Sequence, residues 1–344
     1  MIVTVWLSGE NERLAQSELA AVARRLGGRS LNGKELGVVP RRGVVELPDR
    51  IAAGELSKRL ALAHRCAERW PETDPASIEI RLMRLGASGS SAAFQWVSGS
   101  SARRPPDMLR RLGNAFRSGG GRIALERPEH RFWLETDSES KLCLYEETGC
   151  VDRTGFSARS TPRLPFQRPV TLAPRLARAL VNLAGVGPGD RVVDPFVGTG
   201  SLLLEAALLG ARTVGIDASA TMIRGALENF ALLGQVPEML RQADAAEAAD
   251  EFPTASFDAL VTDPPYGRAS GTRGEPPERL WSRALTAWTM RVRPGGRLGI
   301  VVPTGVQVPR LDARLEFAIP QRVHRSLTRE FRVYVREMES PRSQ

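Results

Sequence analysis

The second half of the chain alternates short apolar runs with helical stretches, and this alternation constrains the fold more than any other feature. Strands are predicted near residues 191–194, 213–217, 257–262 and 297–302, with helices between them. Strands that alternate with helices form a parallel sheet with helices on both faces. Two later runs, 315–323 and 331–336, predict a closing antiparallel hairpin. We therefore expect a doubly wound α/β domain.

A glycine turn follows the first of these strands. It reads Asp194-Pro195-Phe196-Val197-Gly198-Thr199-Gly200 and leads into an apolar helix from Ser201 to Leu209. Because glycine has no Cβ, a ligand can approach the backbone closely at this turn. A dinucleotide-binding turn would have a third glycine three residues after the second, where this chain has Leu203. The turn therefore lacks a complete pyrophosphate cradle, and an NAD site is the weaker interpretation.

Acidic residues end the strands of this half. Asp217 ends the strand at 213–216, where a carboxylate suits the two ribose hydroxyls of an adenosine. The competing interpretation is that Asp194 and Asp217 are only polar strand ends. Asp244 follows the third strand and is a candidate for the adenine amino group, although a helix N-cap is a competing role.

A second motif, Asp263-Pro264-Pro265-Tyr266, ends the apolar run 257–262. Two prolines fix φ and remove two backbone donors, so the chain leaves the strand stiffly extended. The Asp263 carboxylate and the Pro264 carbonyl are then two acceptors for the hydrogens of an exocyclic amine. Tyr266 is placed to stack on the base, a contact worth about 1–3 kcal/mol. Together the two motifs predict a site that presents an amino group to a cofactor.

The motif pair resembles the class I S-adenosylmethionine-dependent methyltransferases that modify exocyclic amino groups. Further stretches are similar to the archaeal tRNA guanine-10 N2-methyltransferases, namely residues 168–170, 174–183, 263–268 and 324–329. The resemblance implies a Rossmann-like methyltransferase fold closed by the antiparallel hairpin, and an N-terminal α+β region with a ferredoxin-like segment and a THUMP module that binds the 3′ end of tRNA. It assigns residues 1–70 to the first segment, 71–148 to the THUMP-like module, 149–168 to a linker and 169–344 to the methyltransferase domain.

The same resemblance extends to site residues. Four carry the chemistry, namely Asp263, Pro264, Pro265 and Tyr266. The residues expected to contact S-adenosyl-L-methionine are Asp194, Phe196, Gly198, Thr199, Gly200, Asp217, Ala218, Asp244, Ala245 and Asp263. The target guanine must leave its stack before N2 reaches the methyl group. Methyl transfer to N2, once or twice, is the activity expected.

In the N-terminal region we expect a strand at Ile2–Leu7, a helix at Glu12–Leu26, a strand pair at 38–39 and 44–47, and a helix at Glu55–Cys66.

The chain is basic, with a formal charge of +9 and a pI near 10.3. Arginines that bind phosphate oxygens as charged forks would suit an RNA partner. Candidate RNA contacts are Arg103, Arg104, Arg110, Arg111, Arg117, Arg122, Arg268, Arg325 and Arg329. The alternative for the cluster between 101 and 122 is a solvated helix face.

The three cysteines form no C-x-x-C pair, so no metal site is predicted. Without a signal segment or an apolar run of about 20 residues, a cytoplasmic protein with no membrane partner is expected. The chain is expected to be a monomer, with a small accessory protein as a possible partner. Three other functions compete: a tRNA guanine-6 N2-methyltransferase, a DNA adenine or cytosine amino-methyltransferase, and a non-catalytic RNA-binding protein.

Overall fold

The computed structural model describes residues 1–31, 41–98, 104–137, 140–160, 163–168, 171–265, 276–324 and 327–337. The chain forms two compact units. The first contains residues 1–7, 26–58 and 64–151, and the second contains residues 8–25, 59–63 and 152–344. The division into segments at 70, 148 and 168 remains a prediction.

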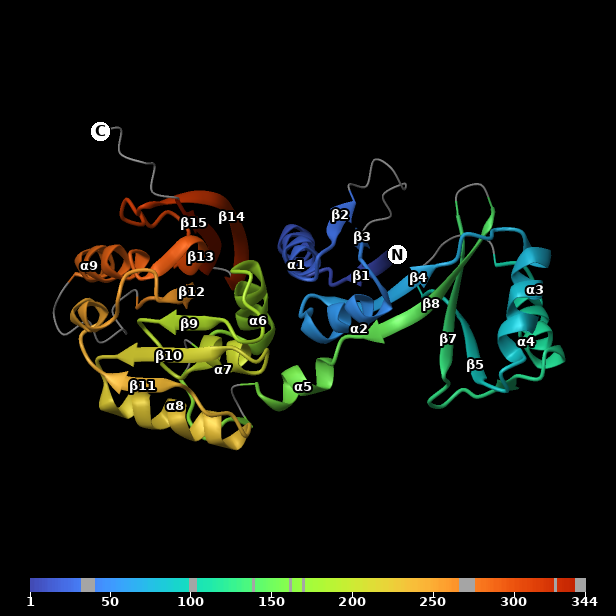
Figure 1. Cartoon of the computed structure of the whole chain (residues 1–344), viewed down its shortest axis with the longest axis horizontal. Helices are drawn as coiled ribbons and strands as arrows, with labels where there is room; N and C mark the ends of the chain where they lie inside the picture. Colours follow the sequence, from blue (N-terminus) through green and yellow to red (C-terminus); the bar gives the residue numbers. More distant parts are fainter. Residues whose placement is uncertain are drawn as a thin grey trace. The chain divides into compact units, whose positions relative to one another are not determined.

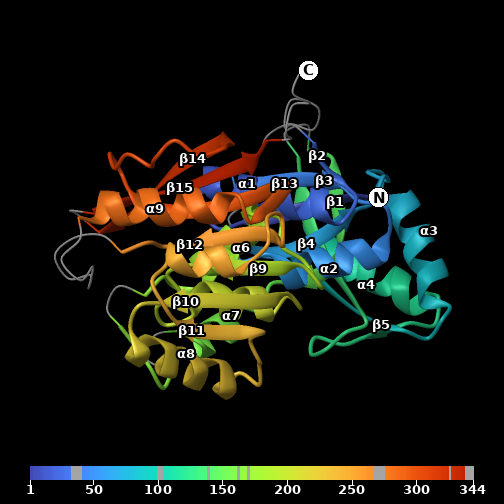
Figure 2. The same ribbon diagram turned by 60° about the vertical axis from the view of Figure 1, so that its left-hand side comes forward.

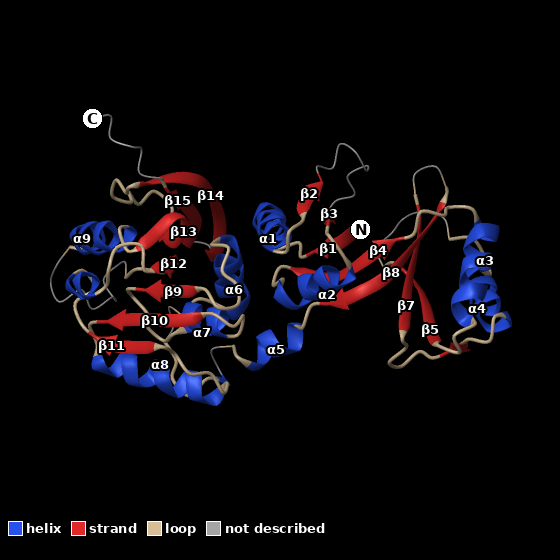
Figure 3. Cartoon of the chain, viewed as in Figure 1, coloured by secondary structure: helices blue, strands red, loops and turns tan. Residues whose placement is uncertain are grey.

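The first unit is built on an eight-stranded sheet in the order β2-β3-β1-β4-β8-β7-β5-β6 (Figure 3). Its strands are β1 (Ile2–Leu7), β2 (Arg29–Leu31), β3 (Arg42–Glu46), β4 (Ala63–Arg69), β5 (Ser91–Trp96), β6 (Arg122–Ile123), β7 (His130–Thr136) and β8 (Leu142–Cys150). Its helices are α2 (Arg50–Arg59), α3 (Pro75–Gly86) and α4 (Met108–Ser118). Helices α3 and α4 pack over a core that includes Trp70, Phe116 and Phe132.

One of the expected N-terminal elements, the helix at Glu55–Cys66, differs from the structure. Helix α2 begins at Arg50, because the carboxylate of Asp49 accepts a bond from Ala52 N at 2.8 Å and so caps the helix. It ends at Arg59, and β4 begins at Ala63, so a single helix from Glu55 to Cys66 is wrong. Strand β3 pairs with β1 and β2, and the expected partner strand at 38–39 lies outside the described residues.

The second unit contains the predicted α/β sheet, in the order β11-β10-β9-β12-β13-β15-β14 (Figure 1). Its strands are β9 (Arg191–Asp194), β10 (Arg212–Asp217), β11 (Met239–Gln242), β12 (Phe257–Thr262), β13 (Val292–Pro303), β14 (Ala313–His324) and β15 (Leu327–Arg336). Strands β9 to β13 run parallel, whereas β15 pairs antiparallel with both β13 and β14. The predicted fold class, including the closing hairpin, is confirmed.

Helices cover both faces of this sheet (Figure 2). The helices on the sheet are α6 (Pro174–Leu183), α7 (Ser201–Ala207), α8 (Ala220–Leu232) and α9 (Pro277–Thr289), with the 3₁₀ segment η2 (Glu247–Glu251) beside α9. Helices α1 (Glu12–Arg25) and α5 (Arg153–Ala158) pack against α6. Side chains alternate along β13: Leu298 and Ile300 join the core under α9, whereas Gly299 faces α6, where an added Cβ would meet Leu180 at 3.2 Å. This layering leaves the strand ends free to form a site.

Helix α1 comes from the start of the chain but belongs to the second unit. Glu18 on α1 is fully buried, and its carboxylate accepts bonds from Ala61 N at 2.9 Å and Leu62 N at 2.8 Å. The side-chain amide of Asn182 on α6 donates a third bond at 2.7 Å. Burial nevertheless raises the pKa of Glu18. A carboxylate with three donors thus ties α1 to α6.

Over the residues that the structure describes, no helix combines the length and the apolar character needed to span a membrane.

Candidate active site

Three neighbouring parallel strands end in acidic residues at the same edge of the sheet. Asp194 ends β9, Asp217 ends β10 and Asp263 follows β12 directly. Strand β9 lies between β10 and β12, so these carboxylates come from adjacent strands. Ligands bind open α/β sheets outside the carboxyl ends of the strands. The structure therefore brings both sequence motifs to one edge.

The glycine turn has the backbone that its sequence requires. Gly198 has φ +52° and Gly200 has φ +85°, the left-handed region that side chains disfavour. A Cβ at Gly200 would meet Ala226 and Phe230 of α8 at 3.3 Å, so this position is also packed. A Cβ at Gly198 would meet nothing nearer than Phe196 O at 3.9 Å, so this part of the turn is open to a ligand.

Asp217 holds the turn as well as ending its strand. Its carboxylate accepts bonds from Gly198 N at 3.0 Å and from Ser219 N at 2.8 Å. Each carboxylate oxygen has more than one lone pair, so these bonds leave acceptor capacity for hydroxyl groups. The carboxylate is thus fixed in place next to the open side of Gly198.

The carboxylate of Asp244 bonds backbone N–H groups at the beginning of the 3₁₀ segment η2. One of its oxygens accepts bonds from Ala246 N at 2.8 Å and Glu247 N at 3.2 Å, at the start of η2. Arg283 on α9 donates to both oxygens at 3.3 and 3.2 Å. Burial acts to raise the pKa of Asp244, but the bonds from Arg283 and the backbone lower it overall. Asp244 thus holds the turn that leads into η2, whose N-cap residue is Ala246, and the adenine contact of Asp244 and Ala245 remains a prediction.

Asp194 links the two motifs. It is 2% exposed, and one oxygen accepts both Phe196 N at 3.0 Å and the hydroxyl of Thr262 at 2.7 Å. Burial raises the pKa of Asp194 to about 7, although these two bonds act to lower it. The negative charge of Asp263 raises it further. The Thr262 hydroxyl thereby joins the glycine turn to the strand that carries the second motif.

The second motif is anchored on both sides. The indole of Trp281, a buried residue of α9, donates to Pro265 O at 2.9 Å. Arg329 on β15 donates from Nη1 to one oxygen of Asp263 at 3.3 Å. The other Asp263 oxygen is buried and has no hydrogen-bond partner among the residues described. Burial raises the pKa of Asp263 to about 7, and Arg329 acts against this rise.

Sequence analysis missed three residues that hold this site. Trp281 and Thr262 carry no motif signal. Asn229 of α8 is fully buried and donates to Thr199 O and Phe166 O, both at 3.0 Å. It also accepts from Phe166 N at 3.0 Å. Asn229 therefore fixes the glycine turn from outside it, and only its place on an otherwise apolar helix face could have signalled this.

The predicted RNA contacts fall into three groups. Arg104, Arg110, Arg111, Arg117 and Arg122 are exposed on the first unit. Two of them have acidic neighbours: Arg111 bonds Glu79 at 2.6 Å and Arg110 lies 3.4 Å from Asp107. Arg329 is 6% exposed and bonds Asp263 of the second motif. Tyr266 of the second motif, Arg103, Arg268 and Arg325 lie outside the described residues.

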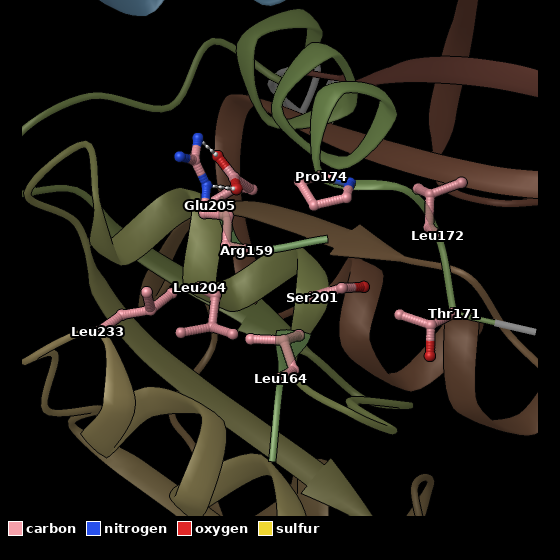
Figure 4. Close-up of a pocket in the computed structure, with 9 residues that line it drawn as sticks. All are labelled: Arg159, Leu164, Thr171, Leu172, Pro174, Ser201, Leu204, Glu205 and Leu233. Atoms are coloured by element: carbon pink, nitrogen blue, oxygen red, sulfur yellow. Dashed lines mark hydrogen bonds and ion pairs between the residues drawn. The ribbon is translucent and has the colours of Figure 1, made fainter. Parts of the chain in front are cut away.

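A small hollow lies beside α7, on the side of Ser201 (Figure 4). Thr171, Ser201 and Leu164 line it, and the ion pair of Arg159 with Glu205 at 2.5 Å forms one wall. The Thr171 hydroxyl lies 3.2 Å from the hydroxyl of Thr199 in the glycine turn. Thr171 thus links the lining of the hollow to the glycine turn.

Comparisons with known proteins identify the family of the chain. The family model for the RMKL-like methyltransferase domain matches residues 162–329. The tRNA (guanine(10)-N2)-dimethyltransferase of Methanothermobacter thermautotrophicus is 30% identical over 98% of this chain and 100% of its own length. The chain belongs to the tRNA (guanine-N2)-methyltransferase family. Members of this family use S-adenosyl-L-methionine as the methyl donor.

Two further proteins extend the comparison. The tRNA (guanine(6)-N2)-methyltransferase of Thermus thermophilus is 29% identical over 78% of this chain and 82% of its own. The crystal structure of TrmN from Thermus thermophilus has a TM-score of 0.50 and 23% identity, and covers 97% of this chain and 100% of that one. This structural likeness supports the fold.

Proposed function

We propose that the protein transfers a methyl group from S-adenosyl-L-methionine to the exocyclic N2 of guanine 10 in tRNA, once or twice. The observation that carries this proposal is the carboxylate of Asp263 at the end of β12. One oxygen is held by Arg329, and the other is buried without a partner among the described residues. A buried acceptor without a donor is costly, and an amine N–H would satisfy it.

The residues at the edge of the sheet fit the cofactor. The open side of Gly198 admits close approach to the backbone, and the neighbouring Asp217 carboxylate has capacity for ribose hydroxyls. Gly200, Phe196, Thr199, Ala218 and Asp194 complete the proposed contacts. When bound, S-adenosyl-L-methionine supplies a methyl group on a positively charged sulfur.

The chain's own residues position the acceptor. Asp263 and the Pro264 carbonyl accept the two hydrogens of the guanine amine, and Trp281 holds the turn by its bond to Pro265 O. Tyr266 is proposed to stack on the flipped base. Positioning of this kind supplies most of the rate enhancement, because it replaces an encounter in solution with a fixed geometry.

We propose tRNA as the substrate because the exposed arginines of the first unit suit an RNA backbone. The segments 1–70 and 71–148 are proposed to be the ferredoxin-like and THUMP parts that hold it. Guanine 6 of tRNA is the second candidate position, because the similar Thermus thermophilus protein is named for methylation at that position. A cytoplasmic location follows from this proposed substrate.

The test is incubation of the full chain with labelled S-adenosyl-L-methionine and an unmodified tRNA transcript, followed by nucleoside analysis and position mapping. N2-methyl- or N2,N2-dimethylguanosine at position 10 is expected. Label at guanine 6 would show the same reaction at a different tRNA position. Label only in adenine or cytosine of DNA would refute the proposal. Asp263→Ala is expected to lower transfer at least about 100-fold, as loss of a key polar group does elsewhere, while cofactor binding by calorimetry stays within a few-fold.

A further inference from the structure

Arg329 reaches the catalytic motif from a distant part of the sequence. It lies on β15, opposite Pro303 of β13, and β13 runs beside β12, which leads into Asp263. This register carries the Arg329 side chain to the end of β12. Its Nη1 lies 3.3 Å from Oδ2 of Asp263, and the two side chains are 7% and 17% exposed.

Because this ion pair is buried, its electrostatic interaction is stronger than that of an exposed pair. Exposed ion pairs contribute little, because water screens them. Here the carboxylate is largely removed from water, which raises its pKa, and the guanidinium of Arg329 acts against that rise. The acidic neighbour of Asp263 is Asp194 on β9: the charges of Asp263 and of Asp217 on β10 both act to raise the pKa of Asp194, which lies at about 7.

Only the ionised carboxylate serves the proposed reaction well. A protonated carboxyl group donates at one oxygen and is a weaker acceptor for an amine N–H than the carboxylate. Burial raises the pKa of Asp263 to about 7 even with Arg329 in place, so the carboxylate is only partly ionised near neutral pH. Loss of a neighbouring cation raises a carboxyl pKa by about 1–3 units.

We propose that Arg329 is a positioning residue of the methyl-transfer step: its guanidinium holds one oxygen of Asp263, keeps the carboxylate ionised and leaves the second oxygen to accept the N–H of the target amine. This inference rests on the proposed function of Asp263. Under this inference Arg329 acts on Asp263 inside the site. The sequence-based prediction was different, because it made Arg329 a contact of an RNA phosphate.

The test compares wild type, Arg329→Met and Arg329→Lys as full chains. Single-turnover methyl transfer at saturating tRNA and cofactor is followed from pH 6 to pH 9.5, together with tRNA affinity and melting temperature. Arg332→Met is the matched control, because Arg332 lies on the same strand and pairs with Glu330 at 2.7 Å. Its pH profile is expected to equal that of wild type.

For Arg329→Met, transfer at pH 7 is expected to fall at least about 5-fold, because a one-unit rise from a pKa near 7 leaves about a tenth of Asp263 ionised. The midpoint of the pH profile moves up by at least about one unit, so the deficit shrinks at high pH, and tRNA affinity changes little. Arg329→Lys keeps a positive charge and is expected to restore the wild-type midpoint.

Three results would overturn the inference. They are an unchanged profile in Arg329→Met, a loss that is equal at every pH, and a loss of tRNA affinity with normal transfer at saturation. If Arg329→Met does not fold, Arg329→Lys decides, since a shifted midpoint in the charged variant contradicts the proposal and a wild-type midpoint supports it. Absence of transfer to tRNA by wild type would instead refute the proposed function itself.

Discussion

At the scale of single residues, the site depends on carboxylates whose charge is controlled by burial. Asp194 is the clearest case, because burial raises its pKa from an ordinary 3.8 to about 7. The folded state therefore binds a proton that the unfolded chain has already released between these two pH values. Stability from this group is complete below pH 3.8, falls as the pH rises towards 7 and is level above it.

This gives a pH prediction for Asp194→Asn. The asparagine keeps an acceptor oxygen for Thr262 and Phe196 N but cannot titrate. Between pH 5 and 7 the free energy of unfolding of the cofactor-free wild type is expected to fall as the pH rises, because of Asp194. Compared with the variant, this extra fall is up to about 1.4 kcal/mol per pH unit. Urea unfolding at pH 5, 6, 7 and 8 measures this difference. Parallel curves for the two proteins would show that Asp194 is not perturbed as described.

Sequence patterns identified the residues that end strands and the glycines with positive φ, because both follow from local rules. They could not place Arg329 next to Asp263, since the two are 66 positions apart and meet only through the register of β12, β13 and β15. Trp281 and Asn229 were missed for the same reason. Trp281 bonds the Pro265 carbonyl 16 positions away, and Asn229 bonds residues 30 and 63 positions away, so neither leaves a local pattern.

At the scale of elements, the glycine turn is held by its neighbouring helix. Asn229 makes three bonds to the turn and to Phe166, all at 3.0 Å, and the bond to Thr199 O is buried. Asn229→Ala leaves the carbonyl of Thr199 buried without this donor. We expect it to lower the free energy of unfolding by about 2–4 kcal/mol and to weaken cofactor binding about 10-fold or more.

The matched control is Glu228→Ala, the exposed neighbour of Asn229 on the same helix. It is expected to stay within about 0.5 kcal/mol of wild type. Chemical unfolding and calorimetry with S-adenosyl-L-methionine measure both effects. If Asn229→Ala binds S-adenosyl-L-methionine with wild-type affinity, the glycine turn keeps its shape without the bonds from Asn229.

Strands β9, β10 and β12 were predicted because they are largely buried and form apolar runs, whereas no range was predicted for β11, which is only partly buried. The helix expected at Glu55–Cys66 was wrong, because alanine and leucine in this stretch suit a helix by propensity alone. In the fold, the backbone N–H groups of Ala61 and Leu62 bond to Glu18 instead of continuing a helix. That contact joins residues 43 and 44 positions apart.

At the scale of the whole molecule, the methyltransferase sheet depends on chain from the N-terminal region. Helix α1 buries Leu14, Leu19 and Val22 within the second unit. Large apolar side chains contribute about 1.5–3 kcal/mol each when buried, so these three alone contribute about 5 kcal/mol or more. Domains of this size are stable by about 5–15 kcal/mol, so a fragment without α1 is expected to be marginal.

The prediction is tested with the fragment 152–344 and the full chain, compared by urea unfolding followed by tryptophan fluorescence. The fragment is expected to unfold at much lower urea or to be recovered unfolded. Adding a synthetic peptide of residues 8–25 is expected to raise its midpoint. A fragment as stable as the full chain would instead favour the predicted domain boundary at residue 169.

The central claim is that the site delivers an exocyclic amine to the methyl group, and a pair of tRNA transcripts tests it most directly. One carries guanosine at position 10 and the other carries inosine, which has the same ring without the N2 amine. With labelled S-adenosyl-L-methionine, we predict label at position 10 of the first transcript and none at that position of the second. Equal labelling of both transcripts would show that the methyl group goes elsewhere and would contradict the account.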